Sequence, residues 1–404
     1  MTTLRYVGLD VHKNSIVMAV AEANSSPAQS SPAQVVAKLG WVESDVLAQL
    51  RKLGPLKSLK VCYEAGPTGY GLQRYLKKAK VDCVVVAPSL VPRKLGNRIK
   101  TDRRDALTLA HFLRSGDLTA VWIPDEQTEA LRDLERARDD ARLADRRIKQ
   151  QLLKFLLRLG RHAPGTMNTW TRTHWAWIRQ QTFDQEAQRR VLADTIQTIE
   201  ATTARIVRLD QDISECIRGW ALEPLVKNLQ AFRGIRLVTA VGLAAEIGDF
   251  TRFATATKFM SFVGLVPREN SSGESRRLGG ITRAGNRHVR RLLIEAAWHY
   301  VSARPVFSQV LADRRKGVPE EVVLIADRAL RRLRKKAGVM MLRKKPPTKT
   351  VTALARELAG FIWAAAKATA GLPKPSTPAA TATTKPTTTN EKRTKRSPSV
   401  AASQ

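Results

Sequence analysis

The chain of 404 residues carries 69 lysines and arginines against 36 aspartates and glutamates, which gives a net charge of +33 and a sequence pI of about 10.8. Such an excess of positive charge favours a polyanionic partner whose phosphates the basic side chains neutralise. The three cysteines lack the spacing of a structural zinc site, no apolar run reaches membrane-spanning length, and the first residues show no secretory signal, so we expect a cytoplasmic, nucleoid-associated protein with no membrane partner.

The first 88 residues alternate between strand and helix patterns. Helices are predicted over 43–53 and about 68–79. Strands are predicted over 4–11, 16–23, 35–42, 59–65 and 81–88. Hairpin-connected strands therefore come first and the strand–helix–strand alternation follows, which predicts an α/β sheet in the order found in ribonuclease-H-like nucleases.

Four carboxylates fall where that fold would bring them together. Asp10 ends the first strand and Glu64 ends the fourth, while Asp102 and Asp105 begin a helix predicted from KTDRRDALTLAHFL. Asp102 can cap this helix, and Asp105 lies three residues further on the same face. Converging carboxylates repel one another unless a cation lies among them, and such oxygen ligands suit Mg²⁺ or Mn²⁺. The four acids therefore predict a metal site able to activate a phosphodiester.

Each of these acids also has a purely structural interpretation. Asp10 can be a turn residue at a strand end, and Glu64 can be a solvated surface acid. Asp102 can serve only as the helix cap, and Asp105 can be a first-turn acid stabilised by the helix dipole. Their joint placement at strand ends and a helix start, in the right order, favours the metal site.

From about residue 126 the pattern becomes helical. Apolar residues recur at three- and four-residue steps between Leu134 and Leu159. A second run has heptad spacing, at Leu192, Ile199, Ile206 and Ile213. Two long helices flanking 160–185 predict an antiparallel coiled-coil hairpin over 126–225, which could also pair with another subunit.

Two further features of the helical region have alternative interpretations. The predicted hairpin tip carries Trp170, Trp175 and Trp177, which can stack on nucleobases or anchor the hairpin end by packing. Residues 229–253 are similar to a helix-hairpin-helix, whose turn amides contact a phosphate. Because Arg236 stands where that turn usually has its second glycine, a packing motif is an equal alternative.

Residues 264–291 place a glycine- and serine-rich loop among seven arginines, ahead of an apolar helix. Ser271 and Ser272, followed by Gly273, put two hydroxyls on a turn, and forked guanidinium donors could surround a phosphate there. The alternative is a solvated basic loop whose serines only favour the turn. The residues predicted to bind nucleic acid are Arg268, Arg276, Arg277, Arg283, Asn286, Arg287, Arg290 and Arg291.

The remainder of the chain is predicted to be helical up to about residue 370. From 371 to 404 the sequence is rich in Pro and Thr and poor in bulky apolar residues. Such a composition cannot bury enough surface to order itself, so 371–404 is expected to be a disordered basic tail.

Several motifs together, over roughly residues 4–345, closely resemble the insertion sequence 110 family of DEDD transposases. They are GLDVHK, YEAGPTGYG, KTDRRDA, AEIGDFTRF and FVGLVPRENSSGESRRLGGITRAGNRHVRRLL, and they contain all four acids and both serines. The resemblance implies a Holliday-junction-resolvase-like (RuvC-like) domain with the acid tetrad over 1–125, a coiled coil for assembly over 126–225, and a mainly helical transposase domain over 226–370.

The family's nucleophilic serine lies directly before the glycine, and this position selects Ser272 over Ser271 here. The resemblance also implies a structured guide RNA from the element's own non-coding end, which pairs with donor and target double-stranded DNA. Because recombination joins several DNA ends, we expect a homo-oligomer, a dimer or a tetramer.

The expected function is therefore that of a transposase or recombinase of a bacterial insertion sequence. Asp10, Glu64, Asp102 and Asp105 would hold Mg²⁺ or Mn²⁺, and Ser272 would attack the scissile phosphate. One alternative is a metal-dependent resolvase or nuclease that uses activated water without a covalent serine intermediate. Another is a non-catalytic nucleic-acid-binding protein.

Overall fold

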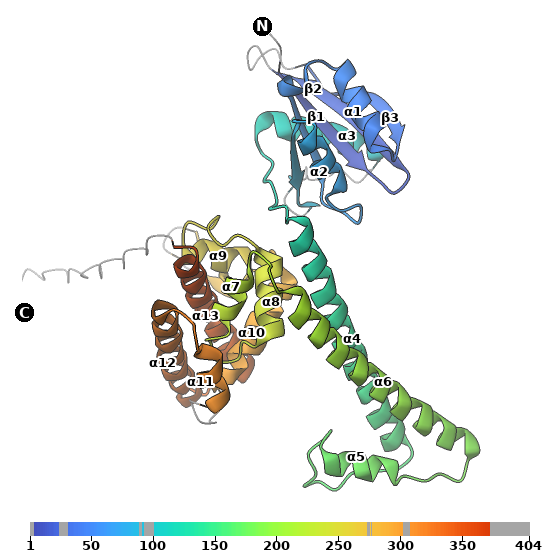
Figure 1. Ribbon diagram of the computed structural model, residues 1–404, viewed down its shortest axis with the longest axis vertical. Helices are drawn as coiled ribbons and strands as arrows, with labels where there is room; N and C mark the ends of the chain where they lie inside the picture. The colour runs from blue at the N-terminus through green and yellow to red at the C-terminus, as the bar shows by residue number, and fades with distance from the viewer. Residues whose placement is uncertain are drawn as a thin grey trace, which may run out of the picture. The chain divides into compact units, whose positions relative to one another are not determined.

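The computed structural model describes residues 4–23, 31–88, 91–92, 101–272, 275, 277–301 and 308–371 (Figure 1). The chain divides into two compact units, with the boundary between Asp125 and Glu126. We call them unit 1 and unit 2. Arg276, Gly273 and nearly all of the basic tail predicted over 371–404 lie outside the described residues.

Unit 1 is built on a five-stranded mixed sheet with the strand order β3-β2-β1-β4-β5. Its strands are β1 (Arg5–Val11), β2 (Ser15–Glu22), β3 (Gln34–Gly40), β4 (Leu59–Glu64) and β5 (Asp82–Val86). The first three strands pair antiparallel, whereas β1 pairs with β4 and β4 with β5 in parallel. This α/β arrangement is consistent with the ribonuclease-H-like order predicted from the sequence.

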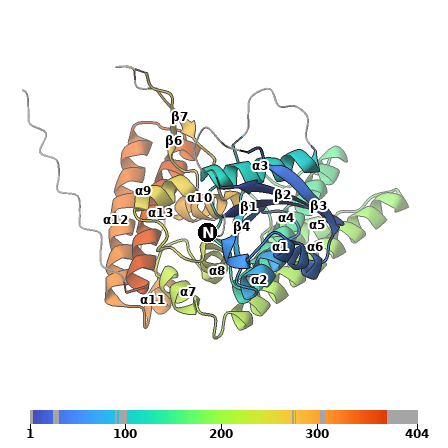
Figure 2. The same ribbon diagram turned by 90° about the horizontal axis from the view of Figure 1, so that it is seen from above.

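Three helices cover the two faces of the sheet (Figure 2). They are α1 (Glu43–Lys52), α2 (Gly71–Lys78) and α3 (Asp102–Ser115). Because side chains alternate along a strand, Leu9 of β1 packs on one face with Leu50 of α1 and Leu76 of α2. On the other face, Val17 of β2 packs with Ala106 of α3.

Gly8 allows α3 to lie directly on β1. A Cβ atom at this position would collide with the backbone of Ala106 and Ala110 in α3. Only glycine permits this approach. The helix is thereby held against the strand that carries Asp10 near its end.

Unit 2 begins with two long helices joined through a shorter one. They are α4 (Glu126–Arg158), α5 (Arg172–Arg179) and α6 (Glu186–Cys216). Arg138 of α4 pairs with Asp210 of α6 at 2.8 Å, and Thr128 accepts a hydrogen bond from Trp220 just beyond α6. The start of α4 therefore lies beside the end of α6, and the two helices run antiparallel (Figure 1).

The end of this helix pair has its own apolar cluster, which includes Leu152, Leu156 and Ile199. Trp170, Trp175 and Trp177 are partly buried against the cluster, with Trp170 edge-on to Trp175. This packing accounts for the three tryptophans as anchors of the hairpin end.

The rest of unit 2 surrounds one apolar core. Its elements are α7 (Glu223–Leu229), α8 (Leu237–Ile247), α9 (Ala256–Phe262), β6 (Pro267–Glu269), β7 (Leu278–Ile281), α10 (Arg287–Val301), α11 (Gln309–Arg315), α12 (Glu320–Leu342) and α13 (Pro347–Thr369). Every residue of α8 from 240 to 247 is buried. The segment that is similar to a helix-hairpin-helix thus contains a core helix, which favours the packing alternative.

None of the helices within the described ranges is both long and apolar enough to cross a bilayer.

Candidate active site

Asp10 and Glu64 stand at neighbouring strand ends. Leu9 of β1 lies opposite Tyr63 of β4 in a parallel pair, so the next residue of each strand is an acid at the same edge of the sheet. Two residues earlier, Gly8 and Cys62 both face α3. Because side chains alternate, Asp10 and Glu64 belong to that same face.

The start of α3 supplies the other two acids. The helix is capped by Thr101, whose hydroxyl accepts a hydrogen bond from the Arg104 amide at 3.3 Å. The predicted capping role of Asp102 is therefore wrong by one residue, because Asp102 is the first residue inside the helix. With Thr101 satisfying the amide, the Asp102 carboxylate is available for contacts outside the helix.

His12 joins this group, although the sequence patterns did not indicate it. Its Nε2 atom lies 3.0 Å from Asp10 Oδ2 and 3.5 Å from Asp102 Oδ1. One donor atom from each of these three residues lies within 4.8 Å of the others. A histidine two residues beyond a strand-end acid was the available signal, since residues two apart in an extended backbone point to the same side.

The electrostatics of Asp10 reflect its burial, the neighbouring imidazole and two nearby carboxylates. Burial raises the pKa of Asp10, the charge and hydrogen bond of His12 offset part of this rise, and Asp105 and Asp102 raise it further. Asp105 is thus within electrostatic reach of Asp10, while Glu64 ends the adjacent strand. Oxygen donors that repel one another beside an imidazole form a fitting donor set for a divalent metal ion.

The two candidate serines lie on a hairpin formed by β6 and β7, which we call the serine hairpin (residues 267–281). Both serines are exposed. The Ser271 hydroxyl donates to Glu269 at 3.0 Å and accepts from the Arg277 amide at 3.2 Å. Ser272 forms backbone hydrogen bonds with Ser275, at 3.1 and 3.2 Å, and its hydroxyl bonds to none of the other residues that the structure describes. Ser271 therefore shapes the turn, and the Ser272 hydroxyl is the less engaged of the two.

A glycine fixes the return of this hairpin to the core. Gly285 has a φ of +69°, and a Cβ atom there would collide with the backbone carbonyl of Phe262 at the end of α9. The tight turn therefore needs glycine. This turn connects the serine hairpin to α10 and packs against the end of α9.

The predicted nucleic-acid-binding residues separate into two groups. Arg268, Arg277, Arg283 and Arg287 are exposed. Three others are engaged within the packing of unit 2, namely Asn286, Arg290 and Arg291. Arg276 lies outside the described residues.

The engaged residues make specific bonds. Arg290 is 9% exposed and donates to the carbonyls of Val263 and Ala284, both at 2.9 Å. Burial lowers the pKa of Arg290, and the nearby charges of Arg283 and Arg287 lower it further. These bonds link α10 to the end of α9 and to the turn after the serine hairpin.

A largely buried group of charged and polar side chains, with Arg136 half exposed at its edge, ties α10 to α4 and α8. We call it the charge network, and its members are Arg132, Glu135, Arg136, Asp139, Glu246, Asn286, His288 and Arg291. The Glu246 side chain is 2% exposed and lies 2.8 Å from Arg136 and 2.7 Å from Asn286. Burial raises the pKa of Glu246, but the hydrogen bond and charge of Arg136, with Asn286 and Arg132, outweigh burial and hold the pKa below its ordinary value.

Glu135 and Asp139 form the other half of the charge network. His288 Nε2 lies 2.7 Å from Glu135, and Arg291 lies 2.8 Å from Asp139. Burial opposes protonation of His288, yet the hydrogen bond and charge of Glu135 raise its pKa above the ordinary value. The carboxylates of this network are thus compensated within the fold.

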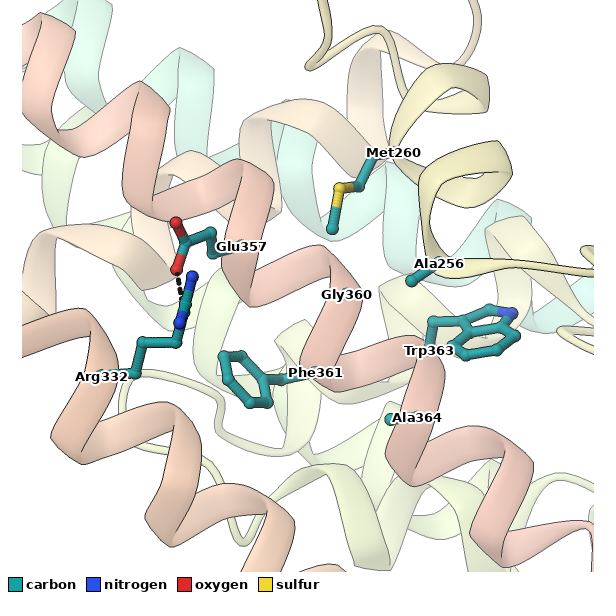
Figure 3. A pocket seen from close by; sticks show the side chains of 8 residues that line it. All are labelled: Ala256, Met260, Arg332, Glu357, Gly360, Phe361, Trp363 and Ala364. Carbon is teal, nitrogen blue, oxygen red and sulfur yellow. Dashed lines mark hydrogen bonds and ion pairs between the residues drawn. The ribbon is translucent and has the colours of Figure 1, made fainter. Parts of the chain in front are cut away.

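A hollow of about 320 Å³ lies between α9, α12 and α13 (Figure 3). Met260, Phe361 and Trp363 give it an apolar lining. Glu357 at its edge is paired with Arg332 at 2.7 Å and with Lys336 at 2.5 Å. Because its carboxylate is neutralised by two cations, the hollow does not offer a second acid site.

Two family models of known proteins match the chain, one over the four acids and one over the serine hairpin. Residues 7–160 match the transposase family model DEDD_Tnp_IS110, and residues 226–312 match the model of the Transposase IS116/IS110/IS902 family. The first match contains the four acids and the second contains the serine hairpin.

Individual relatives are similar over most of the chain. A putative transposase, y4qE, from Sinorhizobium fredii is 41% identical over 362 residues, which cover 90% of this chain and 88% of the relative. The transposase for insertion sequence element IS1533 from Leptospira borgpetersenii is 32% identical over 84% of this chain and 97% of its own length. A probable family 20 transposase from Pseudomonas aeruginosa is 38% identical over 144 residues.

Proposed function

Because this chain belongs to the IS116/IS110/IS902 family of transposases, we propose that it cuts and rejoins insertion-sequence DNA. The acid tetrad and Ser272 would together form the composite site for this reaction. Family membership makes the protein a DNA transposase. The observation that carries the finer proposal is that Asp10, Asp102 and His12 converge at the strand end where Glu64 also lies.

Asp10, Glu64, Asp102 and Asp105, with His12 beside them, would hold the divalent ion. When bound, Mg²⁺ or Mn²⁺ supplies polarisation of the scissile phosphate and favours the ionised form of an attacking hydroxyl. The four acids contribute the negative charge that attracts the cation. Gly8 contributes by holding α3 close enough to β1 for the acids of both elements to share one site.

Ser272 is the proposed nucleophile. Its Oγ would bond to phosphorus while the bond from phosphorus to one DNA oxygen breaks, which leaves a phosphoserine linkage and a free DNA hydroxyl. The serine proton passes to water and the leaving oxygen takes up a proton. Support comes from the hydrogen bonds of Ser271, which engage that hydroxyl in the turn, whereas the Ser272 hydroxyl bonds to no other residue within the described part of the chain.

The exposed arginines of the serine hairpin and its return would hold the DNA phosphates. Arg268, Arg277, Arg283 and Arg287 expose guanidinium groups that can donate two parallel hydrogen bonds to a phosphate. Arg276, adjacent in sequence, completes this proposed set. Such donors stabilise charge that grows on phosphorus during transfer.

The chain would also form an oligomer and bind an RNA that selects its DNA sites. We propose that α4 and α6 form a coiled-coil hairpin that joins copies into a dimer or tetramer, and exposed apolar side chains such as Leu143 (45%) and Val207 (54%) support an outer contact face. The acid tetrad belongs to unit 1 and Ser272 to unit 2, so an oligomer could combine them from different copies. An element-encoded guide RNA would select donor and target DNA, and the net charge of +33 supports its binding.

Ser272→Ala tests the nucleophile, and Ser271→Ala is the matched control. With element-end DNA and divalent ions, we expect wild type and Ser271→Ala to form a protein–DNA adduct that survives denaturation, although Ser271→Ala should do so more slowly because the turn is loosened. Ser272→Ala should form none and should not cut. If Ser272→Ala still cuts DNA and wild type forms no adduct, the enzyme works as a resolvase with activated water instead.

A further inference from the structure

The donor atoms around His12 lie close enough together to share one metal ion after small shifts. An octahedral ion with bonds of about 2.1 Å places neighbouring ligand atoms about 3.0 Å apart and opposite ones about 4.2 Å apart. His12 Nε2 lies 3.0 Å from Asp10 Oδ2 and 3.5 Å from Asp102 Oδ1, and all three donor atoms lie within 4.8 Å of one another. A single ion placed among them would need only small side-chain adjustments.

The alternative is that His12 merely neutralises the two carboxylates. Its side chain is 49% exposed, and those of its partners Asp102 and Asp10 are 51% and 14% exposed, so the imidazole side of both pairs is open to water. Ion pairs in such contact with water contribute only about 0–1 kcal/mol to folding. Stabilising the fold is therefore a weak reason for placing an imidazole between two acids.

The chemistry of the nitrogen donor differs from that of the acids. Mg²⁺ is held by oxygen ligands and keeps several waters, whereas imidazole suits transition-metal ions. Mn²⁺ accepts carboxylate oxygens as Mg²⁺ does, and as a transition-metal ion it also accepts a nitrogen. A site with two or more carboxylates and one imidazole therefore fits Mn²⁺ better than Mg²⁺.

We infer that His12 is a direct metal ligand and that it makes the acid site select Mn²⁺ over Mg²⁺. This inference rests on the proposed metal-dependent function and decides between the two ions that the acids alone allow. The nitrogen ligand comes from the turn between β1 and β2, so one short stretch of chain, Asp10 to His12, supplies two of the donors.

The test uses the full-length protein and two single variants. His12→Asn replaces the imidazole with an amide that offers an oxygen of similar reach. His111→Asn is the matched control, because His111 is also exposed, lies on α3 and is absent from the group around Asp10. Binding of Mn²⁺ and of Mg²⁺ is measured separately by calorimetry.

We expect His12→Asn to weaken Mn²⁺ binding by about tenfold or more and Mg²⁺ binding by less than about threefold, while His111→Asn changes neither. An unchanged ratio of the two affinities in His12→Asn would overturn the inference. A second measurement does not depend on a variant: the pulsed electron paramagnetic resonance spectrum of Mn²⁺ bound to the wild-type protein should show coupling to a ligating ¹⁴N nucleus. Bound Mn²⁺ without that coupling also overturns it.

Failure of the proposed function gives a different result. If the wild-type protein binds neither ion, or if Asp10→Asn binds both as tightly as wild type does, the acid tetrad is not a metal site at all. If Asp10→Asn loses both ions but His12→Asn keeps the wild-type ratio, the metal site stands and only the ligand role of His12 is wrong.

Discussion

The acids of unit 1 and those of unit 2 are placed in opposite surroundings. In unit 1, the Asp102 side chain is 51% exposed, and among the residues that the structure describes no lysine or arginine forms an ion pair with Asp10 or Asp102. In unit 2, Glu246 is 2% exposed and is bonded by Arg136 and Asn286. A carboxylate is thus open to solvent at Asp102 and compensated inside the fold at Glu246, while Asp10, whose side chain is 14% exposed, has only the imidazole of His12 as its ion-pair partner among the described residues.

This difference shows how a structural carboxylate can be told from one kept for a ligand. A buried charge without partners costs several kcal/mol, so evolution can keep Glu246 buried only with its cations in place. Burial raises the pKa of Asp10 most, the charge and hydrogen bond of His12 lower it, and Asp105 and Asp102 raise it further, so an added cation would favour the charged carboxylate. Removing an acid should therefore affect catalysis in unit 1 and stability in unit 2.

The largest effect is expected for Asp10→Asn. Strand cleavage should fall by about 1,000-fold or more, because a ligand of the activating ion is lost. The free energy of unfolding should change little, since burial of the charge and repulsion by Asp105 and Asp102 oppose the attraction of His12. Parallel cleavage assays and urea unfolding curves measure both, and cleavage within about tenfold of wild type would argue against a catalytic tetrad.

Glu246→Gln should lower the stability of the fold, whereas Asp10→Asn lowers cleavage. We expect the free energy of unfolding to fall by about 2–3 kcal/mol, because Arg132 and Arg136 lose their buried countercharge. Arg136 remains half exposed, so water limits the loss. The measurement is urea unfolding without metal, and a change below about 0.5 kcal/mol would contradict the structural role of the charge network.

Within unit 2, the buried Arg290 and the exposed Arg268 should respond differently to the same substitution. Arg290→Met should lower the free energy of unfolding by about 2 kcal/mol, because two carbonyls lose a charged donor. Arg268→Met should change it by less than about 0.5 kcal/mol but reduce the slope of log affinity for DNA against log salt by about 0.9. Equal salt slopes in wild type and Arg268→Met would remove Arg268 from the DNA contacts.

The smallest effect concerns pH. Glu135 raises the pKa of His288 in the folded protein, so this pair contributes its full stability below the ordinary histidine pKa of about 6.5, and the contribution is lost as the pH rises through the folded value. Unfolding free energies from pH 5.5 to 9 should therefore decline in this range, and His288→Gln should flatten the decline. A parallel decline in the variant would assign it to other groups.

Much of the acid site could be predicted from the sequence because its signals are local. A strand-end acid, a second strand-end acid and a capped helix start each follow from short-range patterns. The pairing of β1 with β4 then puts Asp10 and Glu64 at one edge of the sheet, and the packing of α3 on β1 brings Asp102 near Asp10. The cap was misplaced by one residue because Thr101 and Asp102 are both good capping types. His12 was missed because no periodic pattern marks a turn residue that reaches back to a strand end.

Local sequence patterns could not predict which arginines around the serine hairpin are exposed and which are buried. Arg287 and Arg290 lie on the same short stretch and look equivalent in sequence, yet one is exposed and the other is buried against Val263 and Ala284. Arg290 turns inward because the carbonyls of Val263 and Ala284 accept its hydrogen bonds, and such partners follow from the packing of α10 and not from the residues beside it in sequence. The same tertiary contacts place Asn286 and Arg291 in the charge network.

The central claim, that the acid tetrad and Ser272 act as one site, is tested most directly by mapping the protein–DNA adduct. The wild-type protein, incubated with element-end DNA and Mn²⁺ and then digested, should yield by mass spectrometry a nucleotide linked to the peptide that contains Ser272. The same peptide from Asp10→Asn should be unmodified. A linkage at another residue, or an undiminished adduct at Ser272 in Asp10→Asn, would contradict the account.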